Sequence, residues 1–118
     1  MPVSDEFRDY LADQLIEFDG AQFRRMFGGL GTFRDDLMFG LVADDVFYLK
    51  ADDANRLEFE ARGMGPFTYQ RAGKPTSLSY WEVPAEVLED PGGLALWAAG
   101  AWEAARRNAK PKKKRNRT

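Results

Sequence analysis

The sequence predicts an α+β fold of two layers, in which helices pack against a mostly antiparallel sheet of five strands. Two observations support this class. Between residues 22 and 83, runs of β-favouring residues alternate with Asp-Asp and glycine-containing breaks, a pattern typical of consecutive hairpins. Near both ends of the chain, apolar residues recur at the spacing of an amphipathic helix. Local hairpins favour an antiparallel sheet, and the expected order of elements is α-β-β-β-α-β-β-α.

The first helix is expected to begin after Ser4 and to end at Asp19-Gly20. Ser4 is a favourable N-cap, and the acidic pair that follows it suits the positive first turn of a helix. One face of this helix is apolar and would cover the sheet. Its residues are Phe7, Tyr10, Leu11, Leu15 and Phe18.

Three strands are expected next, one within residues 22–34, one near residues 37–42 and one near residues 45–50. Two Asp-Asp pairs would form the turns between them, since Asp bonds readily to nearby backbone N–H groups. Three glycines interrupt the first of these runs, which predicts a bulge or a sharp bend in that strand.

The second half of the chain is expected to hold a helix capped by Asp52 or Asp53 and then a hairpin formed by residues 67–71 and 76–83. Pro84 opens a short turn of helix. Asp90-Pro91 would begin the last helix, which runs to about residue 108.

Four aromatic residues lie on the predicted hairpin: Phe67, Tyr69, Tyr80 and Trp81. A platform on which the bases of single-stranded nucleic acid stack would need surrounding Lys and Arg side chains. This region has only Arg71 and Lys74. Burial between the sheet and a helix is therefore the favoured interpretation.

Two patterns invite a ligand-binding interpretation, but chain geometry explains both better. The glycine cluster at residues 28–31 lacks the Gly-Lys-Ser/Thr ending and the following helix of a phosphate-binding loop. The Asp pairs at 35–36, 44–45 and 52–53 lie at expected breaks and caps, and they do not form the EF-hand pattern. No cofactor and no metal site are therefore expected.

The composition excludes many kinds of chemistry. The 118 residues, 44% of them hydrophobic, suffice for one core. The chain has no cysteine and no histidine, which excludes disulfides, thiolate nucleophiles and Ser-His-Asp arrangements. Chemistry by carboxylates, Lys or Tyr remains open, but no motif indicates it. No run of about 18 apolar residues and no apolar leader is present, so we expect a cytoplasmic, non-enzymatic protein that does not enter a membrane.

Charge divides the chain into a folded domain, residues 1–108, and a disordered basic tail, residues 109–118. Residues 1–105 hold all 19 acids and nine bases, a net charge of −10, and the remaining residues hold eight bases and no acid. The tail would bind polyanions such as nucleic acid weakly and without sequence preference. Its candidate binding residues are Lys110, Lys112, Lys113, Lys114, Arg115 and Arg117.

Three residues are candidate contacts for a protein partner. Arg24 and Arg25 would lie on opposite faces of a strand, so that one pairs within the chain and the other meets solvent. On the last helix, Trp97 is expected against the sheet and Trp102 at the edge of the apolar stripe, where a second copy of the chain could contact it. The partner itself is not identified by the sequence, and a homodimer is one form it could take.

Several ordered blocks carry a family resemblance over roughly residues 20–107. They are Arg25-Met26-Phe27-Gly28-Gly29-Leu30-Gly31-Thr32-Phe33, Met38-Phe39-Gly40-Leu41-Val42, Leu49-Lys50-Ala51-Asp52-Asp53-Ala54-Asn55, Gly65-Pro66-Phe67-Thr68-Tyr69 and Ser79-Tyr80-Trp81-Glu82-Val83-Pro84. The chain resembles the TfoX N-terminal domain family. The resemblance implies a bacterial regulator rather than an enzyme, connected with the competence genes for DNA uptake. Full-length relatives carry a second, helical domain, which we expect this chain to lack.

Two functions follow as alternatives. The first is a regulatory protein-interaction domain acting on or near transcription. The second is a small-ligand-binding or enzymatic domain with a pocket on the sheet that uses Arg25, Lys50 or Tyr80. A large pocket with convergent polar groups would favour the second function, and a flat apolar patch would favour the first.

Overall fold

The computed structural model describes residues 2–26 and 28–109 and has the predicted α+β class. Its elements, in chain order, are α1 (Asp5–Gln14), β1 (Gln22–Met26), β2 (Gly29–Arg34), β3 (Leu37–Ala43), β4 (Val46–Lys50), α2 (Arg56–Ala61), β5 (Pro66–Arg71), β6 (Lys74–Glu82), α3 (Ala85–Leu88) and α4 (Pro91–Asn108). The strands form one antiparallel sheet in the order β1-β2-β3-β4-β6-β5.

The sheet has six strands rather than the five predicted, because residues 22–34 form two strands instead of one. Gly28 adopts a φ of +76°, a left-handed conformation in which glycine is favoured, and the chain reverses there. Gly29 then pairs with Met26 across the new hairpin. A Cβ atom on Gly29 would lie only 2.6 Å from the carbonyl oxygen of Val42. The predicted bend is therefore a complete hairpin turn.

The helix boundaries agree with the sequence in part. Ser4 caps α1 as predicted, its hydroxyl accepting a hydrogen bond from the backbone N–H of Phe7 at 3.0 Å. The helix ends at Gln14, earlier than expected, because a tight turn from Leu15 to Phe18 buries both of those side chains. The last helix begins and ends where predicted.

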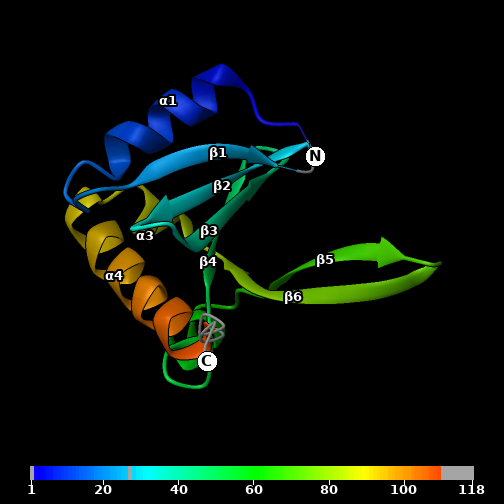
Figure 1. Ribbon diagram of the computed structural model, residues 1–118. Coiled ribbons are helices and arrows are strands. Elements are labelled where there is room, and N and C mark those ends of the chain that lie inside the picture. Colours follow the sequence, from blue (N-terminus) through cyan, green and yellow to red (C-terminus); the bar gives the residue numbers. More distant parts are fainter. Residues whose placement is uncertain (1, 27, 110–118) are drawn as a thin grey trace, which may run out of the picture.

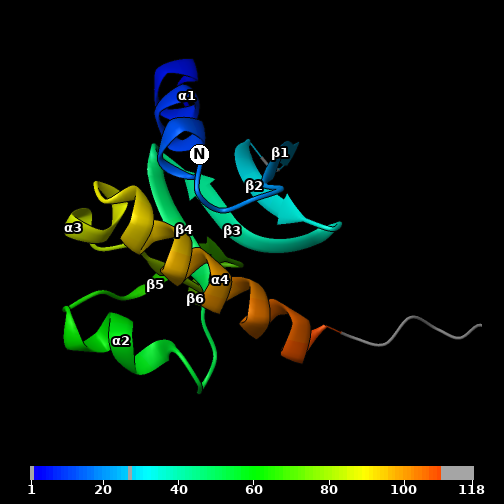
Figure 2. The ribbon, with the colours of Figure 1, turned by 90° about the vertical axis from the view of Figure 1, so that its left-hand side faces the viewer.

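The helices cover one face of the sheet, which we call the inner face. Each of the four helical segments or its adjoining turn supplies side chains to a single core against β2, β3, β4 and the end of β6. Figure 2 shows α4 crossing in front of the strands, and Figure 1 shows α1 lying along β1. The core residues are Leu11, Leu15, Phe18, Leu30, Phe39, Val42, Phe47, Leu49, Ala51, Phe59, Val83, Val87, Leu94, Ala98 and Ala101.

The opposite face of the sheet, the outer face, carries a second and smaller apolar cluster. Side chains alternate along a strand, so β3, β4 and β6 each present apolar groups to both faces. Within the part of the chain that the structure describes, no helix contributes to this outer cluster. Its members are Leu41, Ala43 and Phe67, with the half-buried Met38, Tyr48, Tyr69 and Tyr80.

Strands β5 and β6 form a hairpin that projects from the body of the molecule (Figure 1). Strand β6 pairs with β4 only through Tyr80, Trp81 and Glu82, whereas the rest of β6 pairs with β5 alone. The hairpin turns at Ala72 and Gly73, both of which have positive φ. We call the outer part of this hairpin, residues 66–79, the arm.

Candidate functional site

A row of aromatic rings runs across the outer face and onto the arm. The ring of Tyr48 meets that of Phe67 edge-on, with centroids 5.2 Å apart, and Phe67 stacks on Tyr69 at 6.1 Å. Tyr48 belongs to β4, while the other two residues alternate along β5 on the same side. We call these three residues the aromatic strip.

The two ends of the aromatic strip carry opposite charges. At the body end, Glu82 is the strand partner of Tyr48, and Asp44 lies in the preceding turn. Partial burial raises the pKa of the Tyr48 hydroxyl, and the negative charges of Glu82 and Asp44 raise it further. At the arm end, Arg71 pairs with Lys74 across the turn. Because side chains alternate along a strand, both of these residues lie on the same side of the hairpin as the aromatic strip.

This placement corrects the expectation that the hairpin aromatics are buried between sheet and helix. Trp81 alone faces the core, whereas Phe67, Tyr69 and Tyr80 belong to the outer cluster. Tyr80 and Trp81 are consecutive residues of β6, so they point to opposite faces of the sheet. Alternation could have revealed this separation, but it could not show which face lacks a helix. The contribution of Tyr48 was missed altogether.

The structure brings together two of the three residues of the alternative ligand site, Lys50 and Tyr80, but not Arg25. Lys50 and Tyr80 are strand partners, with the Lys50 ammonium 5.3 Å from the centroid of the Tyr80 ring. The ammonium also donates a hydrogen bond to the Ser79 hydroxyl at 2.6 Å. Burial raises the pKa of Tyr80, which keeps its hydroxyl protonated at neutral pH. Arg25 lies on β1, separated from β4 by two strands.

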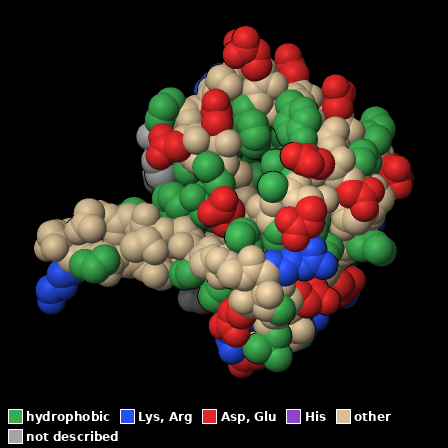
Figure 3. All heavy atoms as spheres, turned by 180° about the vertical axis from the view of Figure 1, so that it is seen from behind, with side chains coloured by type: hydrophobic (Ala, Val, Ile, Leu, Met, Phe, Trp, Pro, Cys, Tyr) green, Lys and Arg blue, Asp and Glu red, His purple; other side chains and the backbone are tan. Residues whose placement is uncertain are grey.

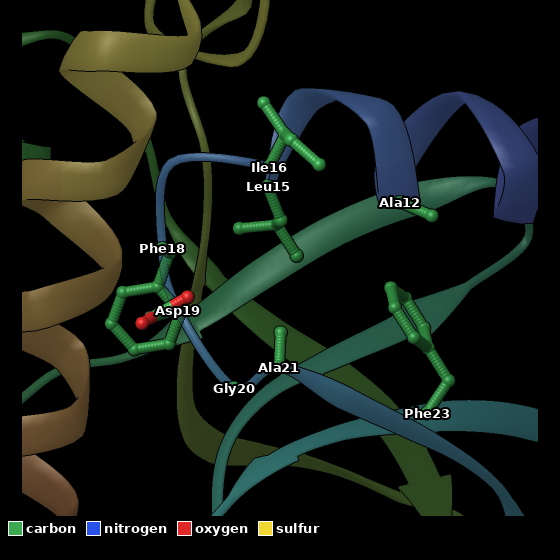
Figure 4. A pocket seen from close by; sticks show the side chains of 8 residues that line it. All are labelled: Ala12, Leu15, Ile16, Phe18, Asp19, Gly20, Ala21 and Phe23. Carbon is green, nitrogen blue, oxygen red and sulfur yellow. The ribbon is translucent and has the colours of Figure 1, made fainter.

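A pocket among the described residues lies elsewhere. It has a volume of about 230 Å³ and opens between the end of α1 and β1 (Figure 4). The side chains that line it are apolar apart from a single carboxylate, that of Asp19. The lining residues are Ala12, Leu15, Ile16, Phe18, Asp19, Gly20, Ala21 and Phe23. Within the described ranges, no group of three or more acidic residues is placed to hold a metal ion.

The candidate arginines behave differently from each other. Arg24 donates to the carboxylate of Asp36, and its guanidinium lies 4.4 Å from the centroid of the Phe33 ring. Arg25 is exposed and has no ion-pair partner within residues 2–26 and 28–109. Arg24 therefore contributes to the sheet itself, and Arg25 remains the one available to a partner.

The two tryptophans of α4 are both half-buried. The indole N–H of Trp102 donates to the carbonyl oxygen of Arg34 at 3.0 Å, and the guanidinium groups of Arg34 and Arg106 lie against its ring. Trp97 packs edge-on against Phe59 of α2, with centroids 4.9 Å apart, a contact that the sequence did not predict. Intramolecular contacts thus account for much of the Trp102 surface, and its role as a partner contact stays a prediction.

Asp52 holds the end of α4. Its carboxylate accepts two hydrogen bonds from the Arg107 guanidinium, at 2.9 and 3.0 Å, and one from the Asn108 amide at 3.0 Å. It also accepts one from the backbone N–H of Ala54, whereas the N-cap position of α2 is Asn55 rather than Asp52 or Asp53. The bonds from Arg107, with smaller contributions from Ala54 and Asn108, lower the pKa of Asp52 to about 2.

Replacing Asp52 with asparagine is expected to lower the melting temperature by about 5 °C at pH 7, because the charge-assisted bonds to Arg107 are lost. A carboxylate whose pKa is lowered in the folded state stabilises that state above its unfolded pKa. The difference between variant and wild type should therefore persist down to about pH 4 and shrink towards pH 2. Thermal melts across this range measure it.

Asp53→Asn is the matched control for that experiment. Its carboxylate is 95% exposed and bonds only to the neighbouring Arg56, a pair that contributes little to stability. A melting temperature of Asp52→Asn within about 1 °C of wild type at pH 7 would contradict the assigned role of Asp52.

Two further predictions concern the basic tail and membrane insertion. The six candidate basic residues of the tail, Lys110 to Arg117, lie outside the described residues, so nucleic-acid binding by the tail stays a prediction. Among the described helices, none is both long enough and apolar enough to cross a membrane.

Comparison with known proteins shows which family the chain belongs to. Residues 13–105 match the TfoX N-terminal domain. Over 95 residues the chain is 32% identical to the DNA transformation protein TfoX1 of Aliivibrio fischeri. That alignment covers 80% of this chain and 46% of the relative, so the chain spans about half the length of the curated protein it matches. The resemblance inferred from the sequence blocks is confirmed: the chain belongs to the TfoX N-terminal domain family.

Proposed function

We propose that this chain is a non-enzymatic regulatory domain that acts by binding another protein through the outer face of its sheet. The apolar cluster on that face, which no described helix covers, is the observation that supports this function best. The partly exposed members of this cluster are Met38, Tyr48, Tyr69 and Tyr80. Methionine and tyrosine are enriched in protein interfaces.

The family supports a regulatory role connected with DNA uptake. The relative from Aliivibrio fischeri carries the name of a DNA transformation protein, and the shared region is its TfoX N-terminal domain. By this analogy we propose that the bound partner belongs to the transcription machinery or to a factor that controls it.

The alternative, a ligand-binding or enzymatic domain, has less support. The described pocket is small, has Asp19 as its one charged side chain, and does not include Arg25, Lys50 or Tyr80. On the outer face, Lys50 already bonds to Ser79. Burial raises the pKa of Tyr80, so its hydroxyl is protonated at neutral pH and cannot act as a base. Ser79 does not line the described pocket either.

The test compares two surface variants in the source cell. Tyr69→Glu places a charge in the aromatic strip, and Leu96→Glu is the matched control, since Leu96 is 75% exposed on α4. Each variant is used as bait for affinity capture after nuclease treatment, and transcript abundances are measured in parallel. We expect Tyr69→Glu to lose both the captured protein and the transcript response, and Leu96→Glu to keep them.

Two results would contradict the proposal. One is capture that is equally strong for wild type and Tyr69→Glu, which would place the interface elsewhere. The other is a transcript profile that does not change when the whole chain is removed from the cell, which would separate the domain from transcription.

A further inference from the structure

We infer that the arm docks on a second copy of this chain, so that two copies clasp each other through their outer faces. Each arm would lie along the aromatic strip of the other copy, with its basic tip over the acidic end of that strip. The inference rests on the proposed function, because both use the outer face, so the second copy and the regulatory partner would compete for it.

Within a single copy the arm is held to the body at its base, through Phe67 and Ser79. Beyond Ser79, towards the tip, the residues of β6 pair only with β5, and β5 forms one edge of the sheet. A two-stranded hairpin with nothing packed against it is only marginally stable in water. The half-buried Tyr69 and the 36% exposed Leu78 are the groups of the arm that a second surface would cover.

The arm also differs in charge from everything around it. Residues 66–81 contain two bases, Arg71 and Lys74, and no acid. The other described residues contain nine bases and 19 acids, a net charge of −10. Figure 3 shows basic side-chain atoms at the tip of the projecting arm and acidic side chains spread over the body. The tip is therefore attracted to the body of another copy.

The order of charges along the aromatic strip makes it self-complementary. It runs from Asp44 and Glu82, through Tyr48, Phe67 and Tyr69, to Arg71 and Lys74. A two-fold axis through the middle of the strip reverses this order in the second copy. Acidic end then meets basic end twice, and aromatic rings meet aromatic rings between them, as an isologous interface requires.

A nucleic acid is a less suitable occupant of the arm. A β-ribbon can enter a groove of DNA, but this ribbon offers two positive charges at its tip. The acidic body beside it would be brought close to the phosphates and would repel them. The same two charges are complementary to Glu82, the strand partner of Tyr48, and to Asp44, whose charge acts on the Tyr48 hydroxyl.

A charge-swap experiment on the full chain tests the inference. In the tip variant, Arg71→Glu and Lys74→Glu are combined. In the acceptor variant, Glu82→Lys is combined with Asp44→Asn, because asparagine tolerates the positive φ of 53° at that position. The mass of each sample is measured by light scattering and sedimentation over a range of concentrations.

The wild type is expected to form a dimer as its concentration rises. The tip variant and the acceptor variant, each alone, should dimerise at least about tenfold more weakly, since like charges then meet at both ends. Mixing the two variants should restore the dimer, because both contacts of the mixed pair join opposite charges. The control Arg8→Glu with Arg56→Glu makes the same change in net charge as the tip variant, but on helices α1 and α2, and should dimerise as the wild type does.

A wild type that stays monomeric at every concentration would overturn the inference, and so would a mixture that dimerises no better than its components. Binding of duplex DNA that is lost in the tip variant of a monomeric chain would assign the arm to nucleic acid instead. A monomer would leave the capture experiment of the proposed function intact. Conversely, loss of the captured partner from Leu96→Glu would count against the proposed function without affecting the dimer.

Discussion

Replacing Phe59 with alanine is expected to lower the free energy of unfolding by about 3–5 kcal/mol. The Phe59 ring is 1% exposed and lies between Trp97, 4.9 Å away, and Trp81, 6.2 Å away. It is the buried residue of α2, a helix of six residues that is too short to be stable without tertiary contacts. Removing the ring leaves a cavity between α2, α4 and β6. Denaturant unfolding measured by tryptophan fluorescence gives the change directly.

Leu57→Ala is the matched control on the same helix. Leu57 is 65% exposed, so its truncation should change the free energy of unfolding by no more than about 0.5 kcal/mol. If the two variants unfold at the same denaturant concentration, α2 does not depend on Phe59 for its attachment. Hydrogen exchange in residues 56–61 would then locate the contact that replaces it.

The class of the fold was predictable because hairpins and amphipathic helices are determined by residues that are close together in the sequence. Ser4 and Pro91 sit at helix starts for reasons that involve only their neighbours in sequence. The missed strand has an equally local cause that is harder to detect. The break after Met26 lies inside a continuous run of β-favouring residues and depends on the left-handed conformation of Gly28. A glycine in a strand predicts either a bulge or a reversal, and the sequence does not decide between them.

The candidate site was less predictable, because it depends on which face of the sheet the helices cover. Tyr48 and Tyr80 alternate with the core residues Phe47 and Trp81, so both faces of these strands are apolar in the sequence. The contacts of Asp52 were also hidden, since Arg107 is 55 residues further along the chain. Such contacts arise from tertiary packing, which local spacing does not encode.

Deleting residues 109–118 is expected to abolish nucleic-acid binding by this chain. The deletion removes six bases, whereas residues 1–105 carry a net charge of −10 and repel phosphates. Full-length chain should bind a labelled duplex in the micromolar range or more weakly at physiological salt. With about six phosphates neutralised, affinity should fall about a thousandfold between 50 and 200 mM salt. Fluorescence anisotropy with random and defined duplexes should show equal binding, because the tail reads charge and not bases.

The control for that experiment keeps the tail and removes its charge, by exchanging its lysines and arginines for glutamine. This full-length variant should bind as weakly as the truncated chain, which separates the effect of charge from that of length. The truncated chain should melt within about 2 °C of full length, because the contacts of Asp52 with Arg107 and Asn108 are retained. A salt-resistant, sequence-selective complex formed by the truncated chain would contradict the prediction. It would move the nucleic-acid contact onto the sheet or the arm, where Arg25, Arg71 and Lys74 are the bases that remain available.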